Sequence, residues 1–163
     1  MNRRYILDAC CGGKMMYFDK NDSRVLSQDV RVVPKMKIES NGSYFEVKPD
    51  VVGDFTRMGF ADKEFPVVVF DPPHLRCGRT SFMYLKYGTL DARWSETIRR
   101  GFAECFRVLR PMGVLIFKWS DSFKSLDAVL ELSPEKPLFV HKTMSRSMKR
   151  FTYFVIFVKG ARK

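Results

Sequence analysis

The sequence predicts a single α/β domain with a mostly parallel β-sheet. The length of 163 residues fits one domain of ordinary size. Continuous apolar runs suit strands that are covered on both faces, and they alternate with segments of helical character. Such alternation is typical of a parallel sheet with right-handed crossovers. No repeat, low-complexity tract or linker divides the chain, so we expect one domain over residues 1–163.

The first half of the chain contains the segments expected to form the early strands. Residues 5–10 read as a buried strand that enters a glycine turn. Residues 25–29 and 51–55 are two further strand-like segments, and each has an acidic residue at or next to its end. Between them, Asn41-Gly42 is a strong tight-turn signal flanked by strand formers, and it predicts an inserted β-hairpin.

The second half contains the clearest elements. Residues 66–70 are continuously apolar before Asp71, as a central parallel strand requires, and two prolines then stop the strand. Residues 94–109 repeat apolar side chains at spacings of three and four, which predicts an amphipathic helix. We also expect a long loop over 74–90, a strand at 114–119 and a helix from about 122 to 132. Strands at 138–141 and 153–158 close the chain and place one antiparallel strand near the edge of the sheet.

The composition favours a globular protein that binds polyanions. Lysine and arginine total 29 against 18 aspartate and glutamate, a formal net charge of +11 that attracts nucleic acid. No apolar run reaches the roughly 18 residues that cross a membrane. Residues 1–8 hold no apolar segment of signal-peptide length, so we expect a cytoplasmic protein without a membrane partner. The four cysteines form no Cys-x-x-Cys pair, so no metal site and no disulfide framework is expected.

The first candidate motif, Asp8-Ala9-Cys10-Cys11-Gly12-Gly13, follows the first expected strand. It places an acid and two glycines beyond the carboxyl end of a strand, where doubly wound sheets bind ligands. Glycines there let the backbone come close to a ligand. The segment does not match the Gly-x-Gly-x-x-Gly pattern of dinucleotide sites or the Gly-Lys-Ser/Thr of a phosphate-binding loop. An ordinary strand-to-helix turn is the alternative interpretation.

The second motif, Asp71-Pro72-Pro73-His74, is more specific. The prolines fix the backbone and remove N–H donors, which leaves carbonyl oxygens and the Asp71 carboxylate as acceptors. Acceptors beside a flat ring suit a planar substrate with an exocyclic amine. The amine donates to Asp71 and to a proline carbonyl, and the His74 ring stacks on the substrate. A rigid turn without a chemical role is the alternative.

Together the motifs resemble the class I methyltransferases, which use S-adenosylmethionine as methyl donor. Asp-Pro-Pro followed by a ring resembles the catalytic tetrapeptide of amino-group methyltransferases that act on adenine N6 or cytosine N4. Residues 8–13, 69–75 and 113–119 also resemble small phage- and prophage-type methyltransferases of unassigned target. The resemblance covers nearly the whole chain and implies a single-domain Rossmann-like fold, with a seven-stranded, mostly parallel sheet and an antiparallel seventh strand.

The resemblance also assigns roles to individual residues. Asp8 and the two glycines would line the methionine end of the cofactor, and Asp29 would take the ribose hydroxyls. Asp54 would lie near the adenine amine, with Phe55 against its ring. The implied cofactor-binding set is Asp8, Ala9, Cys10, Gly12, Gly13, Asp29, Asp54, Phe55 and Asp71, and the implied catalytic set is Asp71, Pro72, Pro73 and His74. No metal is required.

Two features depart from the family pattern. The catalytic ring is usually Tyr, Phe or Trp, and here it is His74, which stacks less well and can titrate. The chain also has no room for a large, separate target-recognition region. Its candidates for that task are the loop over 75–91 and the basic stretch over 142–150.

The loop after the catalytic motif interleaves cations with aromatic rings. Such a mixture is typical of sites that bind single-stranded or flipped-out bases, because cations meet phosphates and rings meet bases. The expected substrate-binding residues are Arg76, Arg79, Phe82, Tyr84 and Tyr87. A solvated basic loop whose rings pack on the domain is the alternative.

Three functions are consistent with these patterns. The first is an amino-group methyltransferase that acts on nucleic acid, with DNA adenine N6 favoured and an RNA base next. The second keeps the fold and the cofactor but takes a protein or a small molecule as substrate. The third is a non-catalytic nucleic-acid-binding module on the same fold, which His74 in place of the usual ring keeps open.

Overall fold

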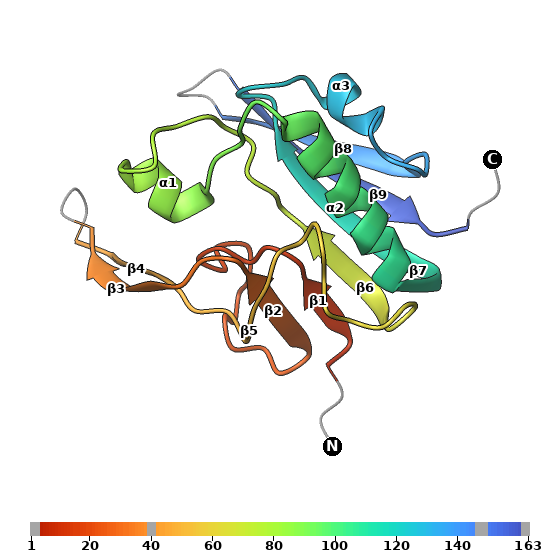
Figure 1. Cartoon of the computed structure of the whole chain (residues 1–163), viewed down its shortest axis with the longest axis horizontal. Helices are drawn as coiled ribbons and strands as arrows, with labels where there is room; N and C mark the ends of the chain where they lie inside the picture. The colour runs from red at the N-terminus through yellow and green to blue at the C-terminus, as the bar shows by residue number, and fades with distance from the viewer. Residues whose placement is uncertain (1–3, 39–41, 146–149, 161–163) are drawn as a thin grey trace.

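A sheet of seven strands organises the part of the chain that the structure, a computed structural model, describes: residues 4–38, 42–145 and 150–160. The strands are β1 (Ile6–Asp8), β2 (Val25–Asp29), β5 (Val51–Val52), β6 (Phe65–Phe70), β7 (Leu109–Ser120), β8 (Phe139–Ser145) and β9 (Arg150–Val158). Their order across the sheet is β5-β2-β1-β6-β7-β9-β8 (Figure 1). The five strands from β5 to β7 are parallel, whereas β9 is antiparallel to both of its neighbours. The predicted mostly parallel sheet with one antiparallel strand near its edge is therefore confirmed.

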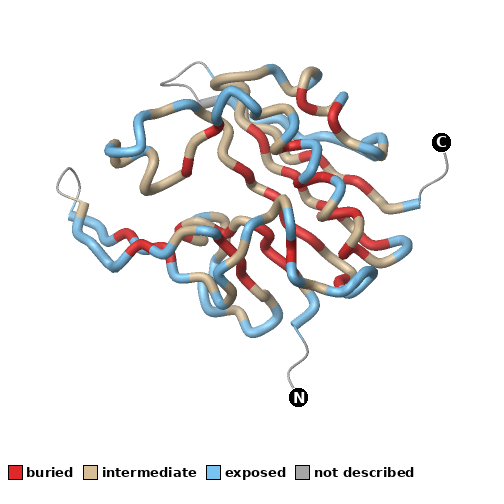
Figure 2. The backbone as a smooth tube through the Cα atoms, in the orientation of Figure 1, coloured by how far each residue is buried: buried red, intermediate tan, exposed pale blue. Residues whose placement is uncertain are grey.

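The longest helix covers one face of this sheet. The helix α2 (Trp94–Val108) buries Ile98, Phe102, Cys105 and Phe106, the stripe that the sequence predicted. The Phe102 ring lies 4.8 Å from that of Phe117 on β7, centroid to centroid. Burial of each such side chain stabilises the fold by about 1.5–3 kcal/mol. Figure 2 shows the buried backbone following the central strands beneath this helix.

Helices are missing from the crossovers of the first half, contrary to the expected alternation of strands and helices. Residues 9–24, which join β1 to β2, form turns and no helix, and residues 53–64 before β6 also contain none. Asp19 and Asp22 explain part of this, because each carboxylate accepts a hydrogen bond from the backbone N–H two residues later. Such Asx turns compete with helix formation.

The predicted hairpin lies between β2 and β5. It consists of β3 (Val33–Lys37) and β4 (Tyr44–Val47), which pair antiparallel, while Asn41 of the turn signal lies outside the described residues. The hairpin forms a second small core around Val33, Phe45 and Val47. A short helix, α1 (Phe82–Tyr87), packs on this core and lies beside the hairpin in Figure 1.

The helix α1 corrects the prediction of a continuous loop over 74–90. Its N-cap is Ser81, whose hydroxyl accepts the Tyr84 N–H at 3.1 Å, and Gly88 ends it with φ +73°. Six residues are too few for a recognisable helical period, so the sequence pattern missed it.

Other bounds differ by a few residues from those predicted. The helix expected over 122–132 is shortened to α3 (Leu126–Leu130), which begins after its cap at Ser125. The strand β7 begins at Leu109, directly after α2, instead of at 114, and the register against β6 shifts near this point. No helix among the described residues is long and apolar enough to span a membrane.

Candidate functional site

The carboxyl ends of the parallel strands bring the predicted acids to one edge of the sheet. Asp8 and Asp29 end β1 and β2, and Asp71 directly follows β6. The negative charges of Asp71 and Asp29 both act on Asp8 and contribute to raising its pKa. Two neighbouring cavities open at this edge, and Arg31 lines both of them.

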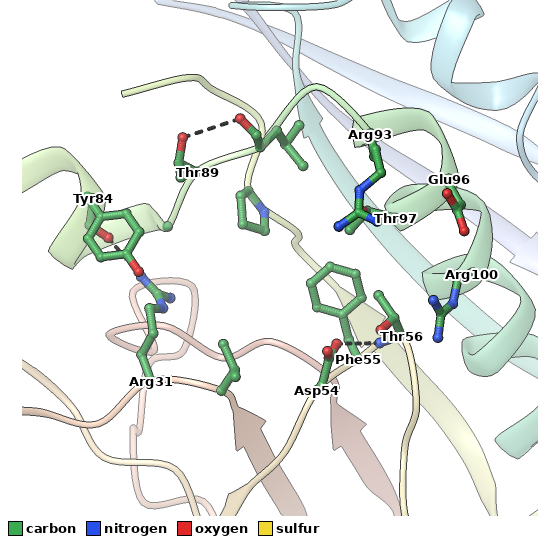
Figure 3. A pocket seen from close by; sticks show the side chains of 14 residues that line it. Arg31, Asp54, Phe55, Thr56, Tyr84, Thr89, Arg93, Glu96, Thr97 and Arg100 are labelled. Atoms are coloured by element: carbon green, nitrogen blue, oxygen red, sulfur yellow. Dashed lines mark hydrogen bonds between the residues drawn. The ribbon is translucent and has the colours of Figure 1, made fainter. Parts of the chain in front are cut away.

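The first cavity has a volume of about 360 Å³ and is shown in Figure 3. Arg31 and Tyr84 lie on one side of it and residues of α2 on the other, with Phe55 between them. The Asp54 carboxylate lines the cavity and accepts the Thr56 N–H at 2.8 Å. Phe55 packs edge-on against Phe70, with ring centroids 5.3 Å apart. Asp54 and Phe55, which the sequence analysis expects to contact the adenine of the cofactor, therefore line the same cavity.

Gly101 on α2 explains why the Phe55 ring can take this position. A Cβ at residue 101 would lie 2.5 Å from Phe70 Cζ and 2.9 Å from Phe55 Cδ2. Real Cβ atoms essentially never come that close to other atoms, so a side chain at this position would displace both rings. The floor of the first cavity thus depends on a glycine in the covering helix.

The second cavity, of about 120 Å³, joins the two predicted motifs. One wall is the glycine loop, residues 10–17, and the other contains Asp71, Pro72, His74, Tyr87 and Lys118. The glycine loop therefore faces most of the predicted catalytic motif across a single space. Pro73 is the exception, because it lines the first cavity. Residues 8–13 and 71–74 are about sixty positions apart in the chain, and the parallel pairing of β1 with β6 brings them together.

The glycine loop is held close to the sheet by an ionic contact beneath it. Gly12 has φ +48°, and its N–H donates to Asp29 Oδ2 at 2.8 Å. The Arg31 side chain donates to both Asp29 oxygens at 3.0 Å. Asp29 is only 2% exposed and lines neither cavity, so in this structure it fixes Gly12 and Arg31. Its predicted contact with the ribose hydroxyls remains a prediction.

Asp8 lies buried beneath the second cavity and does not line it. The Tyr17 hydroxyl donates to Asp8 Oδ2 at 2.9 Å, and the Cys10 N–H donates to Oδ1 at 3.3 Å. Burial raises the pKa of the Asp8 carboxyl to about 7, against the lowering effect of the Tyr17 hydrogen bond. Asp8 thus supports Cys10 and Tyr17, which do line the cavity.

One carboxylate oxygen of Asp71 has no hydrogen-bond partner within the described part of the chain. Lys118 Nζ donates to Asp71 Oδ2 at 2.6 Å, while Oδ1 is buried and has no hydrogen-bond partner. His74 Nδ1, 4.0 Å from Oδ1, is also buried and unpartnered. Burial lowers the pKa of His74, so its imidazole is neutral at neutral pH. An acceptor oxygen and a neutral ring therefore meet at the second cavity.

The substrate residues predicted on the 75–91 loop are only partly brought together. Tyr87 lines the second cavity, 5.9 Å from the His74 ring, and Tyr84 lines the first. Phe82 is not part of the expected aromatic mouth, because it packs edge-on against Phe45 in the hairpin core. Arg76 lies over the Phe123 ring and Arg79 lines no described cavity, so neither points into the site.

Sequence reasoning missed several residues of the site, among them Tyr17, Arg31 and Lys118. Besides holding Asp29, Arg31 Nη1 donates to the carbonyls of Tyr84 and Leu85, and so ties the glycine loop to α1. The signal for Lys118 was present, since it is the one charged residue within the apolar run 114–119. No three His, Cys, Asp or Glu side chains cluster as a metal site in the described ranges.

Comparison with known proteins gives matches in structure alone. No model of a known protein family matches the chain, and no curated protein matches it significantly. A protein from Pyrococcus horikoshii OT3 superimposes with a TM-score of 0.61 at 17% identity, over 96% of this chain and 82% of that one. An S-adenosylmethionine-dependent methyltransferase from Methanosarcina mazei gives a TM-score of 0.57 at 12% identity, over 98% and 93% of the two chains.

Another similar structure carries a cofactor product and a substrate. The 1,6-didemethyltoxoflavin-N1-methyltransferase of Burkholderia thailandensis, solved with 1,6-didemethyltoxoflavin and S-adenosylhomocysteine, gives a TM-score of 0.61 at 12% identity. That match covers 96% of this chain and 71% of the other. The chain therefore has the fold of S-adenosylmethionine-dependent methyltransferases. Fold alone does not fix the activity, since a [4+2]-cyclase also matches, with a TM-score of 0.56.

Proposed function

We propose that this chain is an S-adenosylmethionine-dependent methyltransferase that methylates the exocyclic amine of a nucleic-acid base. DNA adenine N6 is the favoured target and an RNA base is the next. The observation that carries the proposal is Asp71 Oδ1, a buried acceptor that has no partner among the described residues and belongs to a side chain of the second cavity. A buried acceptor without a partner is destabilising by itself, so it suits an oxygen that a substrate donor satisfies.

The two cavities fit the two ends of the cofactor. In the first cavity, the Asp54 carboxylate can accept from the adenine amine and the Phe55 ring can pack on the base. In the second, the Gly12-Gly13 backbone admits the methionine end, because glycines let a ligand come close. When bound there, the cofactor supplies an electrophilic methyl group on a sulfonium. Solved structures with the same fold hold S-adenosylhomocysteine, which agrees with this assignment.

The residues of the chain align the acceptor nitrogen. Asp71 Oδ1 accepts an N–H of the target amine, and the Pro72 carbonyl is a second acceptor for it, so the nitrogen lone pair turns toward the methyl group. Lys118 holds the other Asp71 oxygen and fixes the direction of the carboxylate. The neutral His74 ring packs on the substrate ring. Such a site accelerates the reaction through alignment and preorganised electrostatics.

The charge and the rings support a nucleic-acid substrate. A net charge of +11 favours a polyanion. His74 and Tyr87 stand together at the second cavity, where an unstacked base can contact both rings. A small-molecule amine is the second candidate, because the Burkholderia thailandensis neighbour acts on a small molecule.

The test is transfer of isotope-labelled methyl from the cofactor to DNA, to RNA and to nucleosides, followed by nucleoside mass spectrometry. We expect Asp71→Ala to lower the rate by about 10²-fold or more while cofactor affinity stays nearly unchanged, since removing one preorganised partner of the reacting group has effects of this size. The matched control is Asp127→Ala on α3, an exposed aspartate away from both cavities.

Three outcomes would contradict the proposal at different levels. An Asp71→Ala rate within about tenfold of the parent, roughly 1.4 kcal/mol of barrier, means that Asp71 is only a turn residue. Cofactor binding without label in any nucleic acid moves the substrate to a small molecule or a protein. Nucleic-acid binding without any methyl transfer points to a non-catalytic module.

A further inference from the structure

A third cavity adjoins the second one and shares His74 and Tyr87 with the predicted site. Its volume is about 210 Å³, and its lining includes Ser120 from the end of β7, Ser122 just beyond it, and Arg150 and Thr152 from the start of β9. We infer that this cavity binds a phosphate group of the substrate, next to the base whose amine is methylated. The inference rests on the proposed function and adds the part of the substrate that lies beyond the base.

The third cavity lies where the rest of a substrate must go. His74, Tyr87 and Lys118 line both it and the second cavity, so these three side chains form the border between the two spaces. A base whose amine contacts Asp71 has to leave the second cavity past this border. The volume is below the roughly 300–1,000 Å³ of a pocket for a whole ligand, so the cavity suits one part of a substrate.

The polar part of the lining has donors and no acid. Besides the apolar Leu75 and Met83, the third cavity is lined by four hydroxyl groups and two cations, and by no aspartate or glutamate. The Ser122 hydroxyl already donates to the His74 carbonyl, which leaves Ser120 and Thr152 beside Arg150. Ser120 and Thr152 are direct partners in the β7–β9 register, so their side chains leave the same face of the sheet. An arginine with several hydroxyl donors is the chemistry that recognises phosphate oxygens.

The charges around this cavity leave the Arg150 guanidinium available. Lys118 is engaged with Asp71, whereas Arg150 makes no ion pair within the described part of the chain. The nearby Asp121 carboxylate is engaged too, since it accepts the Phe151 N–H at 2.9 Å and the Tyr153 hydroxyl at 3.4 Å. The third cavity therefore presents a guanidinium that no carboxylate pairs with among the described residues, and an anionic group can take that place.

Binding calorimetry on the protein saturated with S-adenosylhomocysteine tests the inference without requiring turnover. The ligands are deoxyadenosine, deoxyadenosine monophosphate and a short single-stranded oligonucleotide containing one adenine. We expect at least one phosphate-bearing ligand to bind about tenfold or more tightly than the nucleoside, and Arg150→Gln to remove most of that advantage, because one hydrogen bond to a charged group is worth about this much. Ser120→Ala should remove a smaller part of it.

The matched control is Arg99→Gln, which removes the same charge from an exposed position on α2 outside all three cavities. It should leave the nucleoside-to-nucleotide ratio unchanged. A response to Arg150→Gln with the mononucleotide identifies a free nucleotide phosphate, and a response with the oligonucleotide alone identifies a strand phosphate. Affinities that do not depend on phosphate, or that Arg99→Gln lowers as much as Arg150→Gln, overturn the inference. Phosphate-dependent binding without methyl transfer to nucleic acid would remove the proposed function and leave this subsite.

Discussion

Asp8 makes the stability of the fold depend on pH in a direction opposite to that of most carboxylates. Its carboxyl is 1% exposed, and burial raises its pKa from 3.8 to about 7. Between these two values the folded chain binds more protons at Asp8 than the unfolded chain does. The contribution of this group to stability therefore falls as the pH rises from about 4, and it levels off above about 7.

The size of the effect follows from the shift. One pKa unit corresponds to 1.36 kcal/mol, so ionised Asp8 lowers the free energy of unfolding by about 4 kcal/mol above pH 7. Asp8→Asn removes the charge and keeps an oxygen that can accept the Tyr17 hydroxyl. Its amide group cannot accept the Cys10 N–H, and losing that long hydrogen bond removes about 1 kcal/mol. We therefore expect Asp8→Asn to be more stable than the parent chain by about 3 kcal/mol near pH 8 and nearly equal to it near pH 5.

Urea denaturation at pH steps between about 5 and 8.5, without cofactor, measures this difference. Comparing the two chains isolates Asp8, because the other titrating groups are common to both. Asp50 and Glu104, whose pKa values are lowered, change the stability of both chains equally. A constant difference across this pH range would mean that Asp8 is ionised in the folded chain, and it would refute the reasoning. Asp8→Ala should in addition weaken cofactor binding, since it removes the acceptor that holds Tyr17 and Cys10 at the second cavity.

Further predictions concern the first cavity, the His74 ring and the loop over 75–91. Gly101→Ala should destabilise the fold by about 1–3 kcal/mol through overpacking against Phe55, and it should weaken cofactor binding by calorimetry. Gly59→Ala, where an added Cβ meets nothing within 4 Å, is the control, and an equal effect of both changes would disprove the packing argument. His74→Tyr should keep or raise the methyl-transfer rate if the ring only stacks, whereas complete loss of activity would assign the imidazole a hydrogen-bonding or proton-transfer role. Replacing Arg76 and Arg79 with glutamine should make the slope of log K against log salt shallower by about one to two units if both contact phosphates, and an unchanged slope would exclude them.

The sequence predicted where the two motifs meet better than it predicted the elements around them. Both motifs follow strands, and parallel strands place their carboxyl ends at one edge, so the meeting of Gly12 with Asp71 follows from strand order alone. The crossovers were harder to predict, because a missing helix leaves no periodic signal. The short helix α1 was also hard to predict. It is stabilised by packing of Phe82 on Phe45, a contact between segments far apart in the chain. Tertiary contacts of this kind determine whether a short helix or strand forms, and local sequence propensity does not predict such contacts.

Lys118 shows how a charged residue in an otherwise apolar strand can help to predict a contact in the fold. A lysine between Phe117 and Trp119, both fully buried, contradicts the apolar pattern of a central strand. The Lys118 side chain is only 20% exposed, and an ammonium largely removed from water is unfavourable without a partner, so the lysine itself indicates an acid on a neighbouring strand. The structure supplies that acid through register: Phe70 is paired with Phe117, which places Asp71 beside Lys118. Only one Asp71 oxygen is used in this pair, and the other is left without a partner in the described part of the chain, as the proposed contact with a substrate amine requires.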